Sequence, residues 1–71
     1  MGDHIYRVIK LTGSSETSHA DAIQNAIARA SKTMRNLRWF EVTQMRGEIG
    51  DGGRIRHYQV TMEVGFTLDE K

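Results

Sequence analysis

Alternation of apolar and polar side chains over residues 54–68 constrains the fold more than any other feature of this chain. The apolar positions are Tyr58, Val60, Met62, Val64, Phe66 and Leu68, and the residues between them are polar or glycine. Because successive side chains of a strand point to opposite faces of a sheet, this spacing predicts a strand with one buried face. Such a face needs a second layer, which the rest of the chain has to provide.

Residues before the glycine at position 13 predict a first strand. The segment from His4 to Thr12 is rich in β-branched and aliphatic side chains. Ile5, Ile9 and Leu11 share one face of this strand, and we expect that face to point inward.

A change of period predicts one helix, from Ser18 to Asn36. Its apolar stripe recurs every three or four residues, at Ala20, Ile23, Ile27, Ala30, Met34 and Leu37. Ser14, Ser15, Thr17 or Ser18 could each cap the N-terminus, and Ser18 has Asp21 three residues later, as in a capping box. We expect Asn36 to adopt a left-handed conformation at the C-terminus. The other alanines of this segment are interpreted as residues that raise helix propensity, at positions 22, 26 and 28.

The only tryptophan of the chain lies in a second predicted strand, from about Leu37 to Ile49. Phe40 and Val42 are predicted to face the helix, and Trp39, Glu41, Thr43 and Met45 are predicted to face away from it. A three-residue loop, Asp51–Gly53, would join this strand to the third and keep the inner residues of both on one face. In that register Trp39 lies opposite Gly65, and Gln59 lies opposite Met45.

These elements predict an α+β fold with the order β-α-β-β, in a single domain over residues 1–71. If all strands pair antiparallel, the third lies between the first and the second, and the helix covers one face of the three-stranded sheet. A chain of 71 residues buries only about 60% of its unfolded surface. Since the chain has no cysteine for a disulfide or a zinc-thiolate site, self-association is the predicted source of further stability.

Charge and hydropathy argue against nucleic acid and membranes as partners. Ten Lys and Arg against nine Asp and Glu leave a net charge of +1, which provides no excess of basic residues for nucleic acid. Apolar runs are too short to span a membrane. The first residues lack the charged and then apolar layout of a signal peptide, and we expect a cytoplasmic location.

Trp39 and Gln59 are the candidate binding residues. An indole turned away from the core is typical of a subunit interface or of a stacking platform for a flat ligand. The Gln59 amide offers a donor and an acceptor together, which suits the imide edge of a flavin or a nucleobase, although most surface glutamines are simply solvated. Six residues separate Gln59 from the partner of Trp39, about 20 Å along a strand. One small ligand can therefore contact both residues only if they come from different subunits.

Neither a catalytic nor a metal site is predicted. His4, His19 and His57 lie on three different elements without metal-ligand spacing, and no arrangement of serine, histidine and acid suggests hydrolysis. Three alternatives stay open. They are a small ferredoxin-like oligomeric enzyme that uses Glu41 or His57, a module that binds coenzyme A or a nucleotide, and an RNA-binding face on the basic half of the helix.

Several short motifs make the chain resemble the dodecin family of small flavin-binding proteins. They are Tyr-Arg-Val at 6–8, Leu-Thr-Gly-Ser-Ser at 11–15, Ala-Ile-Ala-Arg-Ala at 26–30, Leu-Arg-Trp-Phe-Glu-Val at 37–42, Arg-Gly at 46–47, Tyr-Gln-Val at 58–60 and Val-Gly-Phe at 64–66. The length of the chain, the order of its elements and the single tryptophan at the start of the second strand also agree with this family.

The resemblance implies a hollow dodecamer in which each sheet wraps its own helix and flavins bind in pairs at two-fold axes. Trp39 matches the tryptophan that stacks on the flavin rings, and Gln59 matches the glutamine that hydrogen-bonds to their pyrimidine end. Arg46 is a candidate contact to the phosphate tail or to an interface. Many bacterial members carry an arginine where this chain has Thr67, so the way in which an FMN phosphate is held stays open.

The function implied by the resemblance is non-enzymatic storage and photoprotection of riboflavin or FMN. Electron transfer from the indole would quench the excited flavin. The implied partners are further copies of the chain and the flavin. Some bacterial members also bind coenzyme A, and no motif in this sequence decides whether this chain does.

Overall fold

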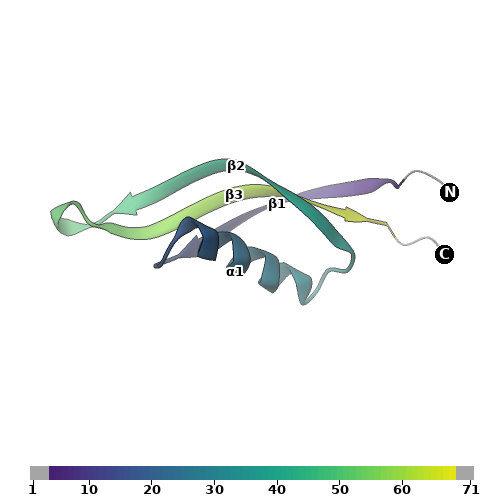
Figure 1. Cartoon of the computed structure of the whole chain (residues 1–71), viewed down its shortest axis with the longest axis horizontal. Helices are drawn as coiled ribbons and strands as arrows, with labels where there is room; N and C mark the ends of the chain where they lie inside the picture. Colours follow the sequence, from purple (N-terminus) through teal and green to yellow (C-terminus); the bar gives the residue numbers. More distant parts are fainter. Residues whose placement is uncertain (1–3, 69–71) are drawn as a thin grey trace.

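Residues 4–68 are described by the computed structural model of the chain, and they form a three-stranded sheet with one helix on one face (Figure 1). The elements are β1 (Tyr6–Ser15), α1 (His19–Ser31), β2 (Leu37–Ile49), a 3-10 turn (Asp51–Gly53) and β3 (Ile55–Thr67). β3 pairs antiparallel with both other strands, so the sheet order is β1-β3-β2. The predicted element order and the central third strand are confirmed. The ends of the predicted domain, residues 1–3 and 69–71, lie outside the described residues.

The core lies between α1 and the face of the sheet that it covers, which we call the helix face. Fully buried residues come from α1 and β3: Ala22, Val60, Met62 and Val64. Ile9 and Leu11 of β1 pack against them, which confirms the predicted inner face at these two positions, whereas Ile5, predicted on the same face, precedes β1 and is 68% exposed. The opposite surface of the sheet, which α1 does not cover, is called the open face.

The predicted apolar stripe of the helix is confirmed in part, because Ile23 and Ile27 pack against the core, but the most buried residue of the helix is Ala22, which the prediction left outside the stripe. Ala22 is fully buried and Ala26 packs beside it, whereas Ala20 is exposed. The cause is Gly13 of β1, because a Cβ at this position would overlap the carbonyl oxygen of Ala22 and lie 2.9 Å from the Cβ of Ala26. The missing side chain permits a close approach of helix and strand. Ala22 and Ala26 therefore belong to the core, and do more than raise helix propensity.

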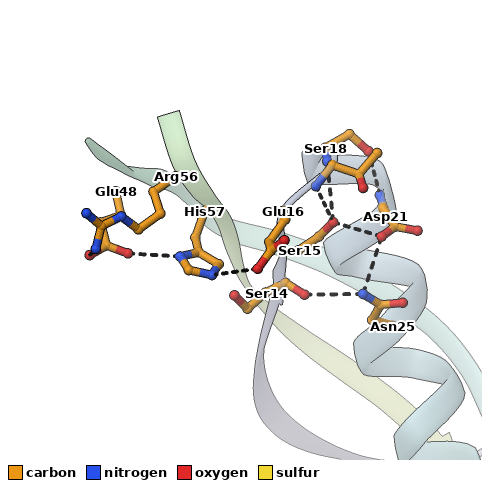
Figure 2. A network of polar contacts seen from close by, with 10 residues as sticks. Ser14, Ser15, Glu16, Ser18, Asp21, Asn25, Glu48, Arg56 and His57 are labelled. Carbon is orange, nitrogen blue, oxygen red and sulfur yellow. Dashed lines mark hydrogen bonds and ion pairs between the residues drawn. The ribbon is translucent and has the colours of Figure 1, made fainter. Parts of the chain in front are cut away.

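Side chains at the corner between β1 and α1 satisfy the first backbone groups of the helix (Figure 2). Ser18 is the N-cap among the four candidates, and its Oγ accepts the backbone N–H of Asp21 at 3.0 Å. The hydroxyl of Ser15, the last residue of β1, donates to the Asp21 carboxylate at 2.7 Å and accepts the N–H of Thr17 at 2.9 Å. β1 thus continues three residues beyond its predicted end at Thr12 and connects directly to the cap.

The helix ends at Ser31, five residues before its predicted end. The backbone N–H groups of Thr33 and Met34 both return to the carbonyl oxygen of Ala30, at 3.2 and 2.9 Å, and close the last turn. Asn36 has the predicted left-handed conformation, with φ 67°. It belongs to the turn into β2, where its carbonyl oxygen accepts the N–H of Thr67 at 3.1 Å.

The pairing of β2 with β3 shifts register at three places, and the shift at Thr43, an extra residue in β2, separates the part around Trp39 from the part around Gln59. Before this bulge, Trp39 has its predicted partner in β3. After it, Gln59 lies opposite Arg46, and the predicted pairing with Met45 is wrong. Because a shift of one residue exchanges the two faces of a strand, Arg46 joins Gln59 on the open face. The same shift turns Met45 to the helix face, contrary to the prediction.

The hairpin of β2 and β3 extends past the N-terminal end of α1 and gives the protomer an elongated shape (Figure 1). The principal extents are 56 × 21 × 13 Å, and the radius of gyration is 14.8 Å, whereas a compact chain of this length has about 11 Å. Met45, Ile49 and Ile55 of this hairpin are 57%, 76% and 54% exposed. Apolar side chains gathered beyond the reach of the helix form a surface that another subunit can cover.

Candidate functional site

The indole of Trp39 lies on the open face and covers Gly65 of β3. A Cβ at Gly65 would overlap Cε2 and Cζ2 of the indole and lie 2.6 Å from its Nε1. Tyr6 of β1 approaches the indole edge-on, with ring centroids 6.0 Å apart and an angle of 66° between the rings. Trp39 remains 38% exposed. The predicted orientation away from the helix is confirmed, and it leaves an aromatic surface that α1 does not cover.

A polar cluster of Gln44, Arg46, Gln59 and Thr61 lies further along the open face. Nη2 of Arg46 donates to Oε1 of Gln44 at 2.6 Å and to Oγ1 of Thr61 at 3.1 Å. Thr61 is buried, so its side chain has little freedom to move and it fixes the position of the guanidinium. Gln59 lies directly opposite Arg46 in the ladder. This cluster can present amide and guanidinium donors together to a polar ligand group.

Trp39 and the polar cluster are not brought together within one protomer. Trp39 pairs with Gly65, which is six residues from Gln59 along β3. At ~3.3 Å per residue this separation is about 20 Å. The bulge at Thr43 brings Arg46 to Gln59, but it does not bring either residue closer to the indole. A ligand that contacts Trp39 and Gln59 together therefore needs two protomers.

Three contributors to these surfaces were not predicted from the sequence: Tyr6, Gln44 and Thr61. The pairing of Tyr6 with Thr67 places its ring on the open face beside Trp39. The predicted register covers only the second and third strands. Aligning the first strand with the third in the same way would have identified Tyr6 as a neighbour of Trp39. Gln44 and Thr61 reach Arg46 only because of the bulge, and no turn residue or glycine in the sequence indicates it.

His57 and Glu41, the candidate catalytic residues of the enzyme alternative, have acidic neighbours on the open face. Nδ1 of His57 donates to Oε1 of Glu48 at 3.0 Å, and Nε2 of His57 lies 3.6 Å from Oε2 of Glu16 (Figure 2). Glu41 lies opposite Glu63 in the ladder. All of these contacts are on the surface, where ion pairs contribute little to stability. His57 is thus part of a surface network at the end of β1.

The remaining histidine contact is structural. Nε2 of His19, the first residue of α1, donates to the carbonyl oxygen of Arg46 at 2.9 Å, and its ring packs edge-on against Tyr58 at 5.1 Å. Residues 4–68 contain no group of three or more His, Asp or Glu placed to hold a metal ion. In the same part of the chain, no helix is long and apolar enough to cross a bilayer.

Comparisons with known proteins place this arrangement in a family. The family model described as Dodecin matches residues 5–69. The dodecin of Thermus thermophilus is 52% identical over 66 residues, which cover 93% of this chain and 94% of the relative. The solved structure of the dodecin from Streptomyces davaonensis has a TM-score of 0.91 and 52% identity, and the match covers 97% of this chain and 100% of that one. The dodecin from Streptomyces coelicolor has the same TM-score at 48% identity, and both chains are covered completely.

Proposed function

This chain belongs to the dodecin family of small, non-enzymatic binding proteins, and from that premise we propose that it binds, stores and photoprotects riboflavin or FMN. Membership in the family implies a homo-oligomer. Our proposal for the assembly is a hollow dodecamer, with residues 1–71 as one flavin-binding domain. Pairs of flavin rings stack between the Trp39 side chains of symmetry-related protomers.

The observation that carries this proposal is the position of the Trp39 indole over Gly65 on the open face. The indole lies against Gly65, where there is no side chain to lift it from the sheet, and it remains 38% exposed, so a second flat ring can stack on it. Stacking on such a surface stabilises a bound ring by roughly 1–3 kcal/mol per contact. A two-fold axis beside this surface would place two indoles around one pair of ligands. Electron transfer from the indole then quenches the excited flavin and limits its photochemistry.

The separation of Trp39 from Gln59 makes oligomerisation part of the site. A pyrimidine ring stacked on the indole of one protomer would receive hydrogen bonds from Gln59 of another, because about 20 Å separates the two positions in one chain. The exposed apolar residues of the β2–β3 hairpin, Met45, Ile49 and Ile55, offer surface for such contacts between protomers. A monomer would therefore provide only half of the binding site.

Arg46 is our candidate for the phosphate of FMN. Its Nη2 is held by Gln44 and Thr61, so the guanidinium is oriented, while Nη1 and Nε make no hydrogen bond to another residue of 4–68. Thr67 pairs with Tyr6 at the other end of the sheet. With threonine at that position, Arg46 is the charged residue that we assign to the phosphate.

Titration of riboflavin and FMN with the purified protein tests the proposed function. We expect both ligands to lose most of their fluorescence on binding, because the indole stacks on their rings. Native mass spectrometry should give an assembly of twelve chains with flavins in pairs. Flavin emission that stays unchanged at protein concentrations in large excess would contradict the proposal.

Replacement of Gln59 by alanine is expected to weaken riboflavin binding less than loss of the indole does. The variant loses one donor and one acceptor, each worth about 0.5 kcal/mol at the low end of the usual range, and keeps the stacking surface. We expect an increase in Kd of a few fold and weaker discrimination between riboflavin and ring systems that lack the imide edge. Fluorescence titration with riboflavin and with such an analogue measures both effects. An equal loss of affinity for both ligands would argue against hydrogen bonding by Gln59.

A further inference from the structure

The ring of Tyr6 is the nearest aromatic neighbour of the proposed stacking surface. Tyr6 and Trp39 come from the two edge strands of the sheet, and their side chains meet across β3 on the open face. Their ring centroids are 6.0 Å apart at 66°, the edge-to-face geometry that aromatic pairs prefer. Tyr6 is 44% exposed, so it is not a core residue held there by burial.

The indole is thereby restrained on two sides. Gly65 leaves space directly beneath it, since any Cβ there would overlap the indole ring. A tryptophan above a glycine on an open surface has few contacts that select one rotamer, and the edge of Tyr6 supplies such a contact. A ring that is already oriented loses less conformational freedom when a ligand stacks on it.

We propose that Tyr6 is a positioning residue, which holds the Trp39 indole flat over Gly65 before the ligand binds. Its aromatic ring performs this role, because its hydroxyl has no hydrogen bond to any residue within 4–68. Phenylalanine at this position should therefore suffice, whereas alanine or leucine should not. The inference rests on the proposed function only where it concerns flavin affinity, because the orientation of the indole is a property of the protein without ligand.

The test compares Tyr6→Ala, Tyr6→Leu and Tyr6→Phe with the unaltered protein and with Lys10→Ala. Lys10 lies on the same strand and the same face, opposite Glu63, and serves as the matched control. Leucine keeps an apolar side chain in β1, so it reports on the aromatic edge if the alanine variant fails to fold. The chain has a single tryptophan, so time-resolved fluorescence anisotropy reports on Trp39 alone.

We expect faster depolarisation of Trp39 in ligand-free Tyr6→Ala and Tyr6→Leu, and a three- to tenfold increase in Kd for riboflavin. Tyr6→Phe and Lys10→Ala should keep the anisotropy decay and stay within twofold in Kd. Unchanged anisotropy decay in folded Tyr6→Leu would overturn the positioning role. If the unaltered protein fails to bind riboflavin, the proposed function falls, while the anisotropy measurement still decides the role of Tyr6.

Discussion

Replacement of Trp39 by alanine is expected to weaken riboflavin binding at least about tenfold, or about 1.4 kcal/mol, and to restore the fluorescence of whatever ligand remains bound. The variant removes the surface over Gly65 on which the ring would stack and also the electron donor that would quench it. Because two indoles would enclose each ligand pair, one substitution changes both sides of the proposed site. Equilibrium dialysis measures the affinity without relying on quenching, and the emission of the bound ligand then measures quenching separately.

Trp39→Phe is the matched comparison for this experiment. Phenylalanine keeps a flat ring in the same position but is smaller and a poorer electron donor than indole. We expect intermediate affinity and a clear loss of quenching, which separates stacking from electron transfer. Assembly size is measured for each variant, so that loss of subunits is not mistaken for loss of stacking. Unchanged affinity in Trp39→Ala with the assembly intact would refute the stacking site.

Introduction of valine at Gly13 is expected to cause the largest loss of stability of any single change proposed for this protein. The Cβ of the new side chain would overlap the carbonyl oxygen of Ala22, and no choice of rotamer moves the Cβ away. The helix holds that carbonyl oxygen in place. Overpacking typically costs about 1–3 kcal/mol, and we expect the upper end here because the obstacle is backbone. For a chain of this size that cost corresponds to a decrease of roughly 10–20 °C in Tm.

Ser14→Val provides the control for Gly13→Val, because it places the same side chain one residue later in β1, at an exposed position. We expect its Tm to stay within a few degrees of that of the unaltered protein. Both are compared by circular dichroism at one protein concentration, since the stability of an oligomer depends on concentration. Similar Tm values for Gly13→Val and Ser14→Val would show that the contact of Gly13 with α1 is not tight in solution.

The residues of β3 show why much of this fold could be predicted from the sequence. Strict alternation from Tyr58 to Phe66 specifies a strand with one buried face, and it also specifies the face on which Gly65 meets Trp39. The cap at Ser18 and the turn at Asp51–Gly53 follow from local chemistry, because side-chain caps and positive φ angles involve only neighbouring residues. Such local rules give the order of elements and the orientation of the indole.

Apart from the ends of β1 and α1, the errors in the prediction occur where two distant segments have to fit together. Alanine has the same helix propensity on every side of α1, so propensity does not tell Ala22 from Ala20. The missing side chain of Gly13 permits the close approach that buries Ala22, while Ala20 is exposed. The bulge at Thr43 likewise depends on the whole pairing of β2 with β3. It places Arg46 opposite Gln59 on the open face and turns Met45 to the helix face.

Sequence alone therefore determined the elements, their order and an indole turned away from the helix, since periodicity and caps act over a few residues. Tertiary structure alone decided which alanines enter the core, which polar groups surround Gln59 and which ring stands beside Trp39. The physical reason is that these contacts join residues far apart in the chain. Their geometry depends on close packing and on strand register, and a displacement of one residue exchanges the two faces of a strand.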